Sequence, residues 1–464
     1  MKQYDVVIIG GATSGSFLAR RLAEAGRNVL VLEAKPEEKV GTKYDIFHIG
    51  EPDFARFGLP LPQAGEDLAF KFTGGTNYSA FDKHPKPSGG TVIGMHMHLY
   101  TLRMNRWAIE AGAKFLYGAR FVELLYTDGR ISGLVYEQDG QSISVGTKLV
   151  ADCSGIPSVV RRQLPDGYGV ENFEITSSDM FYVILRYVRY LDEKDYIKQS
   201  RSWPFYKTWE APQEDQRGAI LGVGANLSFE TGEQIYKNFE TAVRLPRHEL
   251  QYIERGATPY RRPPYSFIAD GFLVSGDAAC LTKPSAGEGV TSSMVQLEIS
   301  AQVIGNLLAQ EKPLSRENLW TINKRYNDAQ GKAFANQMAT LVGAVATSDR
   351  ENDFFFEKDV IFSKKSFEAM GEGKELRFST GELLGMAGKM LGGILCGRLR
   401  LSTVRALLRA MQNGNRIASL YAAYPETPEG FNTWCTEANA QWMRCGSMVD
   451  ALQQSNTWKH LPKS

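Results

Sequence analysis

Residues 4–34, which read YDVVIIGGATSGSFLARRLAEAGRNVLVLEA, decide the fold. An apolar run ends at Gly10, and Val29 to Leu32 form a second run, as expected of strands buried on both faces of a parallel sheet. Between them, Gly10 to Gly15 approximate the spacing G-x-G-x-x-G and open a predicted helix. The segment therefore predicts a strand–helix–strand unit.

The same unit has the chemistry of a nucleotide site, although a glycine-rich turn alone is also compatible with a plain strand-to-helix connection. Small residues let the backbone approach a pyrophosphate, whose charge rests on free amides at the positive end of a helix. The residues expected to make this approach are Gly10, Ala12, Thr13, Ser14 and Gly15. Glu33, with Ala34 beside it, closes the second strand and would accept hydrogen bonds from a ribose. Its carboxylate would repel the 2′-phosphate of NADP, which leaves NAD or FAD.

A second segment, Ser275 to Met294 (SGDAACLTKPSAGEGVTSSM), decides between these two. It follows a predicted strand, which Gly276 and Asp277 end, and an acid at a strand end can hydrogen-bond a ribityl chain. The turn that opens the next helix has free amides, which can meet the flavin edge that becomes negative on reduction. The residues of this turn are Gly287, Glu288, Gly289 and Val290. Two distant segments thus predict one extended FAD.

A third segment, Leu149 to Arg162 (LVADCSGIPSVVRR), agrees with FAD. The pattern G-x-x-S-x-V-R is formed by Gly155, Ser158, Val160 and Arg161, and it recurs in one group of FAD enzymes. With the other two segments it predicts that Gly155 lies at the cofactor.

Together these segments resemble the geranylgeranyl reductase family, within the wider class of flavoproteins shaped like p-hydroxybenzoate hydroxylase. The resemblance also includes GATPYRRP from Gly256 and covers most of Met1 to about Gln310. It implies an α/β fold in which a Rossmann-like FAD-binding domain is interrupted by a mostly antiparallel β-sheet substrate domain, with a helical C-terminal region. The implied FAD domain spans 1–165 and 256–325, with 45–95 partly in the substrate domain. The substrate domain then spans 166–255, and the helical region 326–464.

The resemblance further implies an FAD-dependent oxidoreductase that reduces C=C double bonds of an apolar isoprenoid-like substrate by hydride transfer from flavin N5. An external donor, NAD(P)H, ferredoxin or another flavoprotein, would supply the electrons. The chain also departs from the family, because no cysteine follows the ribose acid between Lys35 and Gly58. The aromatic signature Y-x-W-x-F-P over the flavin is reduced to KTWEAP at 207–212, with Tyr206 and Trp209 as pocket candidates. Arg103 is the cofactor candidate near the position where the family has an arginine, and no general acid is identified.

Two alternatives stay open at this point. DCSG and GDAAC also occur in flavin-dependent halogenases, and a flavin-dependent monooxygenase is compatible with the composition. The halogenase signature W-x-W-x-I-P is absent, because no two of the seven tryptophans are two positions apart. A non-catalytic flavin carrier is the second alternative.

The composition of the chain limits the kinds of molecule that it is expected to bind. Lys and Arg total 53 against 52 Asp and Glu, which gives no basic surplus for nucleic acid. Five scattered cysteines without a C-x-x-C pair, and a first strand reached without a signal sequence, predict a cytoplasmic protein without a structural metal. Leu383 to Met411 combine apolar residues with arginines, but the apolar part before the first arginine, about 15 residues, is too short and too glycine-rich to span a bilayer. They predict either helical cover or a peripheral contact with the inner face of the membrane.

Overall fold

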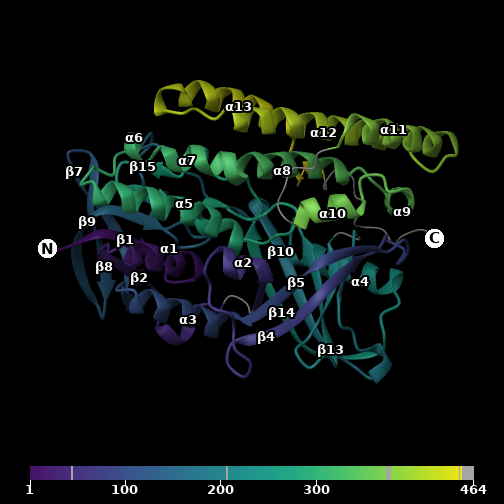
Figure 1. The fold of residues 1–464 in the computed structure, drawn as a ribbon, viewed down its shortest axis with the longest axis horizontal. Helices are drawn as coiled ribbons and strands as arrows, with labels where there is room; N and C mark the ends of the chain where they lie inside the picture. Colours follow the sequence, from purple (N-terminus) through teal and green to yellow (C-terminus); the bar gives the residue numbers. More distant parts are fainter. Residues whose placement is uncertain (43–44, 205–206, 372–377, 449, 452–464) are drawn as a thin grey trace.

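The computed structural model describes residues 1–42, 45–204, 207–371, 378–448 and 450–451. Two β-sheets lie side by side, and a layer of long helices covers them (Figure 1). The predicted α/β architecture, with a Rossmann-like part, a mostly antiparallel sheet and C-terminal helices, is confirmed.

The first sheet is built on parallel strands. Its order is β15-β16-β9-β1-β2-β6, with β8 pairing β9 and β7 pairing β8. Its central strands are parallel because helices connect them and cover both faces, which requires apolar side chains on both sides; Val6, Val7 and Ile8 are fully buried. The strands are β1 Lys2–Ile9, β2 Val29–Glu33, β6 Lys114–Tyr117, β7 Arg120–Thr127, β8 Arg130–Gln138, β9 Gln141–Asp152, β15 Ile268–Ala269 and β16 Phe272–Val274.

Helices from three parts of the chain pack against this sheet. Helix α1 contacts both α3 and α5, and its buried face includes Phe17 and Leu18. The helices are α1 Thr13–Glu24, α3 Met97–Glu110 and α5 Val290–Ala309, whereas α2 Glu51–Arg56 contacts β3 and β5 of the second sheet. Residues near 13 and near 290 therefore lie close together.

The second sheet has the order β14-β10-β13-β12-β11-β4-β5-β3 and is antiparallel except for the β11–β4 pair. Strands from residues 46–96 join strands from residues 180–259 in it. The bounds are β3 Ile46–Gly50, β4 Leu68–Asn77, β5 Lys86–His96, β10 Met180–Tyr190, β11 Ser200–Trp203, β12 Thr208–Pro212, β13 Gly218–Ala225 and β14 His248–Pro259. Strand β14 continues past the predicted boundary at 255, and the exact division into domains stays a prediction.

The two faces of the second sheet differ. Helix α4, Phe229–Ala242, covers one face, where Tyr236 and Phe239 pack with Val188 and Val223. The opposite face has aromatic rings that lie across glycines of the neighbouring strand. A Cβ on Gly94, Gly222 or Gly224 would lie within 2.5 Å of the ring of Phe70, Trp209 or Phe181, respectively. Glycine at these positions is what allows the rings to lie flat on the sheet.

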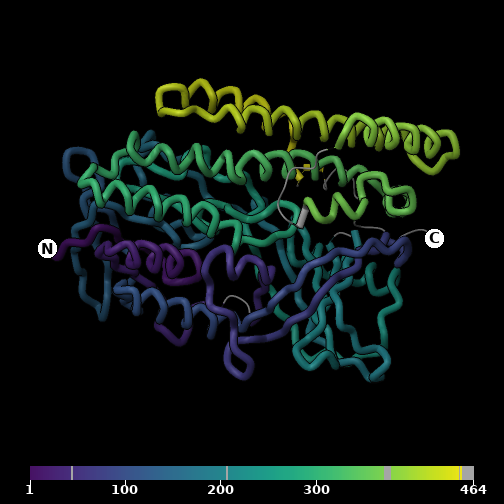
Figure 2. The backbone as a smooth tube through the Cα atoms, viewed as in Figure 1, coloured from purple at the N-terminus to yellow at the C-terminus, as the bar shows by residue number. Residues whose placement is uncertain are grey.

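The C-terminal helices form the outer layer (Figures 1 and 2). Helix α7 passes through a π-helical turn at Asn327–Gly331 into α8, and α12 packs along α8. Tyr424 and Trp434 belong to the same core as Val7 and Leu297, so this layer and the first sheet share one hydrophobic interior. The helices are α6 Arg316–Leu319, α7 Thr321–Tyr326, α8 Lys332–Ala344, α9 Asp349–Glu357, α10 Lys364–Gly371, α11 Thr380–Leu395, α12 Leu401–Ala422 and α13 Phe431–Cys445.

Candidate FAD site

Four parallel strands end at the same level of the first sheet. Ile9 pairs with Leu32 on one side and with Asp152 on the other, and Asp152 pairs with Val274. The residues that follow these strands therefore emerge along one edge. They include the predicted residues Gly10, Glu33, Gly155, Gly276 and Asp277. Ligands of open parallel sheets bind outside this carboxyl edge.

The turn between β1 and α1 is closed tightly by its glycines. Gly10 has a φ of +104°, and a Cβ there would lie 2.4 Å from the carbonyl oxygen of Cys153. A Cβ on Gly15 would lie 1.9 Å from the carbonyl oxygen of Gly10. Ala12 is the N-cap of α1, so Thr13, Ser14 and Gly15 form its first turn, where backbone amides point out of the helix. The geometry suits a pyrophosphate cradle.

Glu33 lies at the end of β2 beside this turn. Its Oε2 accepts a hydrogen bond from Gly11 N at 2.7 Å, and its Oε1 accepts from Lys35 N at 2.9 Å. The carboxylate is buried, with 9% of the residue exposed, and Ala34 follows it. Two backbone donors thus fix the acid that is predicted to hold the ribose.

Gly276 and Asp277 begin a 3-10 turn that ends at Ala279. Gly276 has a φ of +67°, and a Cβ there would lie 2.8 Å from Ser14 Oγ, so this turn approaches the start of α1. A Cβ on Gly289 would lie 3.4 Å from Asp277 Oδ1. Asp277 therefore lies between the β1–α1 turn and the turn that opens α5.

The Gly287–Val290 turn contains its own carboxylate. Glu288 Oε1 accepts from Thr291 N at 2.7 Å, and Glu288 Oε2 accepts from Thr291 Oγ1 at 2.7 Å, which caps α5. Gly287 has a φ of +73°, and a Cβ there would lie 3.7 Å from the ring of Phe181 in the second sheet. The turn is thus the point where the two sheets meet.

Asp152 is a site residue that the sequence reasoning missed. It is fully buried, and its Oδ1 accepts from Ser154 N and Oγ at 3.0 and 2.6 Å. Its Oδ2 accepts from Val160 N and Arg161 N at 3.2 and 2.8 Å. The sequence did contain a signal for this role. Asp152 opens the DCSG motif at the end of a strand, where an acid can accept hydrogen bonds from the loop that follows.

The G-x-x-S-x-V-R pattern has a structural explanation. Ser158 Oγ and Arg161 Nε both donate to the carbonyl oxygen of Ala278, at 3.2 Å each. Arg161 is fully buried, and its guanidinium also lies 4.0 Å from the ring centroid of Phe173. The motif therefore clamps the turn that contains Asp277. Gly155, with a φ of +76°, begins this clamp.

Two other predicted residues, Arg103 and Trp209, do not follow the four strands that end at the carboxyl edge of the first sheet. Arg103, on α3, is held by Asp67, with Nε to Oδ2 at 2.5 Å, and by Glu66 at 2.8 Å. Its role as a cofactor ligand stays a prediction. Trp209 lies on β12 against Gly222, on the face of the second sheet opposite α4. Tyr206 lies outside the described residues.

His48 is a further residue that sequence reasoning missed. It lies on β3 with its ring centroid 6.3 Å from that of Phe70, on the same face of the second sheet as Trp209. Solvent reaches the ring, yet the protein around it lowers the pKa of His48 by burial, and the charge of Glu288 opposes the shift. The surroundings of His48 therefore favour the neutral form of its ring.

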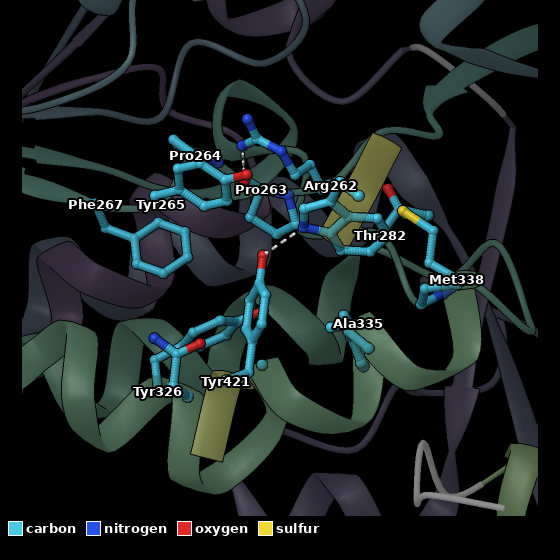
Figure 3. Close-up of a pocket in the computed structure, with 15 residues that line it drawn as sticks. Arg262, Pro263, Pro264, Tyr265, Phe267, Thr282, Tyr326, Ala335, Met338 and Tyr421 are labelled. Carbon is cyan, nitrogen blue, oxygen red and sulfur yellow. Dashed lines mark hydrogen bonds between the residues drawn. The ribbon is translucent and has the colours of Figure 1, made fainter. Parts of the chain in front are cut away.

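A separate small cavity lies behind the Gly287–Val290 turn, called the flavin-side turn below (Figure 3). Its volume is about 20 Å³, room for about one water molecule. Arg262 lies at its edge and makes two hydrogen bonds to Glu171, at 2.7 and 2.8 Å. Tyr421 closes the cavity and accepts a hydrogen bond from Trp442 at 3.2 Å. The cavity thus lies between the loop that contains Thr282 and the helices α12 and α13, which supply Tyr421 and Trp442.

Comparison with known proteins supports the geometry. Residues 3–189 match the family model described as FAD binding domain. The digeranylgeranylglycerophospholipid reductase of Sulfolobus acidocaldarius is 24% identical over 94% of this chain and 97% of its own length. A second such reductase, from Methanothermobacter thermautotrophicus, is 29% identical over 65% of this chain and 77% of its own.

Solved structures show the same fold. A geranylgeranyl bacteriochlorophyll reductase-like protein from Thermoplasma acidophilum has a TM-score of 0.64 at 16% identity, over 86% of this chain and 100% of its own. A flavin-dependent brominase has a TM-score of 0.59 at 16% identity, with the same two coverages.

The protein is an FAD-dependent oxidoreductase, with a Rossmann-like domain joined to an antiparallel sheet. Within that class it resembles the geranylgeranyl reductases along most of its length, as the motifs predict.

Proposed function

We propose that this chain reduces carbon–carbon double bonds in the prenyl chain of an isoprenoid lipid. The observation that carries the proposal is the face of the second sheet opposite α4, which is lined by apolar side chains and approaches the Gly287–Val290 turn at Phe181. The similarity to reductases whose names specify such lipids supports it.

The face opposite α4 has the apolar and aromatic side chains that a prenyl chain needs. Phe181, Leu185 and Tyr187 alternate along β10 and so point to the same side of the sheet. The apolar side chains that are partly buried on this face are Ile46, Val92, Leu185 and Trp209, packed against Phe70, Phe72, Tyr187, Ala211 and Ile220. Burying each CH₂ of a substrate on such a surface favours binding by about 0.8 kcal/mol.

In this proposal each part of the chain has one task. The bound FAD would supply the two-electron chemistry. Gly10 to Gly15 and Glu33 would hold its adenosine and pyrophosphate end, and Asp277 its ribityl region. Gly287 to Val290 would hold the flavin edge, beside the apolar face that excludes water.

A single-turnover experiment tests the proposal. Holoenzyme reduced with dithionite without air is mixed with a detergent-dispersed geranylgeranyl phospholipid, and flavin absorbance and lipid mass are followed. We expect reoxidation of the flavin together with lipid that has gained a pair of hydrogen atoms, whereas the fully saturated lipid should leave the flavin reduced. If instead the flavin is reoxidised only after oxygen, bromide and an aromatic acceptor are added, and the acceptor gains bromine or an oxygen atom, the enzyme is a halogenase or a monooxygenase.

The electrons would come from outside the chain. The glycine turn of β1 and α1 is assigned to FAD, whereas Gly222 lies inside β13 and Gly385 inside α11, so neither follows a strand and opens a helix. NAD(P)H, ferredoxin or another flavoprotein would therefore bind transiently. Stopped-flow mixing with NADPH alone should give slow reduction without saturation at micromolar concentrations; fast, saturable reduction would indicate a dedicated nicotinamide site.

We also propose that α11 and α12 place the enzyme on a membrane surface. On α11, Leu384, Leu391 and Leu395 are 70%, 58% and 79% exposed along one side of the helix. Arg405 and Arg409 are exposed on α12, next to it in the chain. Among the described helices, none has the length and hydropathy to cross a bilayer. Apolar side chains with adjacent basic residues are suited to an anionic lipid surface.

Vesicle sedimentation tests this contact. Wild-type protein should pellet with anionic vesicles at low salt, and both Leu384→Ser/Leu391→Ser/Leu395→Ser and Arg405→Gln/Arg409→Gln should stay more in the supernatant. Arg398 and Arg400 are less suited to the test because they pair with Glu357 and Glu351, each at 2.6 Å. The matched control is Arg244→Gln/Arg247→Gln, which removes two exposed arginines elsewhere. Wild-type protein that never pellets would refute the contact.

A further inference from the structure

Lys207 holds a constrained position between the two sheets. It immediately precedes β12 with a φ of +52°, a conformation that long side chains rarely adopt. Its carbonyl oxygen accepts a hydrogen bond from Gly224 N at 2.9 Å, which anchors the turn on β13. The strained backbone is therefore held in place by the sheet.

The side chain of Lys207 extends toward the flavin-side turn. Its Nζ lies 4.6 Å from the ring centroid of Phe181 and 3.9 Å from the position that a Cβ on Gly287 would take. Phe181 can lie flat beneath it because Gly224 has no side chain. An ammonium group is thus directed from the substrate sheet to the start of the α5 turn.

The ammonium has no hydrogen-bonding counterpart among the described residues. Nζ is inaccessible to solvent, and no hydrogen-bond acceptor contacts it among the residues that the structure describes. Burial lowers the pKa of Lys207 to about 8, so the group stays charged at neutral pH. A buried charge without a partner is costly, and the aromatic face of Phe181 offsets only part of that cost. Such an arrangement is expected where a ligand supplies the missing negative charge.

The turn itself offers less positive charge than a helix start usually does. The Glu288 carboxylate already accepts the hydrogen bond of Thr291 N, and Lys283 Nζ lies 3.9 Å from Glu288 Oε2. An acid at this position opposes the build-up of further negative charge on a ligand held by the same turn. A second cation close to Gly287 would compensate for it.

We propose that Lys207 provides the positive charge that stabilises the reduced, anionic form of the flavin at the Gly287–Val290 turn. The inference rests on the proposed assignment of that turn to the flavin edge. It adds a positioning charge from the substrate sheet, so that the sheet that binds the substrate also tunes the cofactor. Charge placed where negative charge develops is an effective way for a protein to favour reduction.

Sulfite binding and redox potential test the inference without any lipid substrate. Sulfite adds to oxidised flavin and leaves negative charge on the ring, so it reports positive charge nearby. In Lys207→Met we expect sulfite to bind about tenfold more weakly, the loss of about one charge-assisted interaction. The two-electron potential should fall by about 30 mV for each tenfold change. Lys207→Arg, which keeps the charge, should stay close to wild type.

The matched control is Lys237→Met, which removes an exposed lysine on α4, on the other face of the sheet. It should change neither measurement. If Lys207→Met binds FAD and shows the wild-type sulfite affinity and potential, the inference is wrong, even if prenyl reduction is observed. If the wild type lacks lipid reductase activity while Lys207→Met still shifts both values, only the proposed substrate fails. Should Lys207→Met not retain FAD, Lys207→Gln is measured in its place by the same criteria.

Discussion

Gly15 lies so close to Gly10 that a Cβ would overlap with the Gly10 carbonyl oxygen at 1.9 Å. The absence of side chains at these positions is as much a part of the proposed FAD site as the carboxylates of Glu33 and Asp277. Hydrogen bonds then fix the acids, as Gly11 N does for Glu33 at 2.7 Å. At this scale, the site is a backbone surface with a few oriented charges.

The first prediction concerns Gly15→Ala. The added methyl group must displace the backbone of the turn, which typically costs about 1–3 kcal/mol and removes the approach needed by a pyrophosphate. We expect protein that folds but is purified with little FAD, measured by absorbance after gel filtration. Gly388→Ala, in open space on α11, is the control and should keep its colour. Full FAD occupancy in Gly15→Ala would show that the pyrophosphate lies elsewhere.

The second prediction concerns the two acids. Glu33→Ala and Asp277→Ala should each weaken FAD binding by about 1.5–3 kcal/mol, because each loses a charge-assisted hydrogen bond. Fluorescence titration of the apoprotein with FAD measures the change. Glu110→Gln, an exposed acid at the end of α3, is the control. Unchanged affinity in both alanine variants would mean that the site is misplaced.

At the scale of elements, the second sheet is organised by pairs of a glycine and an aromatic ring on adjacent strands. Trp209 of β12 lies against Gly222 of β13, which is its register partner. Phe70 of β4 lies against Gly94 of β5 in the same way. In each pair, the glycine has no side chain to project from the sheet, and the aromatic ring of the adjacent strand lies flat over it. The result is a smooth apolar face beside the flavin-side turn.

The third prediction tests this arrangement through Gly222→Ala. The new Cβ would lie 2.0 Å from the Trp209 ring, so the ring must turn away from the sheet and into the space above it. We expect a change in tryptophan fluorescence and a KM for long prenyl substrates that rises about tenfold, the loss of roughly 1.4 kcal/mol of binding, with FAD content unchanged. Gly89→Ala in β5, where a Cβ meets nothing within 4 Å, is the control. A wild-type KM together with a displaced ring would separate this face from substrate binding.

At the scale of the whole molecule, the C-terminal helices are part of the core around which the FAD domain is built. Trp434 of α13 contacts Tyr265 edge-on, with centroids 5.3 Å apart, and Tyr424 donates to the Tyr265 carbonyl oxygen at 2.8 Å. Tyr265 precedes the strands β15 and β16 that lead to Asp277. The outer layer seen in Figure 2 is therefore connected to the cofactor edge by direct contacts.

The fourth prediction follows from this connection. Trp434→Ala should destabilise the protein by about 3–5 kcal/mol, because it empties a buried aromatic site. Helix loss and FAD release should occur in one shared transition, recorded by circular dichroism and flavin fluorescence during heating. Met443→Ala, on the exposed side of α13, should leave the midpoint unchanged. Two separate transitions in the wild type would show that the helical region unfolds on its own.

The sequence predicted the cofactor well because the residues concerned are close in the chain or end a recognisable strand. Gly10 to Gly15 and the start of α5 are local patterns, and their placement needs only the rule that parallel strands end together. Other features depend on pairings that no local pattern contains. The clamp from Arg161 to Ala278 spans 117 positions, and Arg103 is held by Asp67, 36 positions away. In the sequence, Lys207 only stands where the aromatic signature has its first tyrosine. Its approach to Gly287 is not visible there, because only the fold brings the two residues together.

The common edge formed by β1, β9 and β16 also sets the timing of cofactor capture during synthesis. The ribosome releases β1 first, yet its neighbour β9 ends at Asp152 and β16 at Val274, so the nascent chain cannot assemble the edge until well over half of it has emerged. The turn at Gly287 appears later still. Until β9 has emerged, β1 can pair only with β2, so the other edge of this apolar strand stays exposed to chaperones and to neighbouring chains. A cell short of riboflavin would therefore be expected to lose this protein by aggregation or proteolysis soon after translation, before any shortage of catalytic activity is felt.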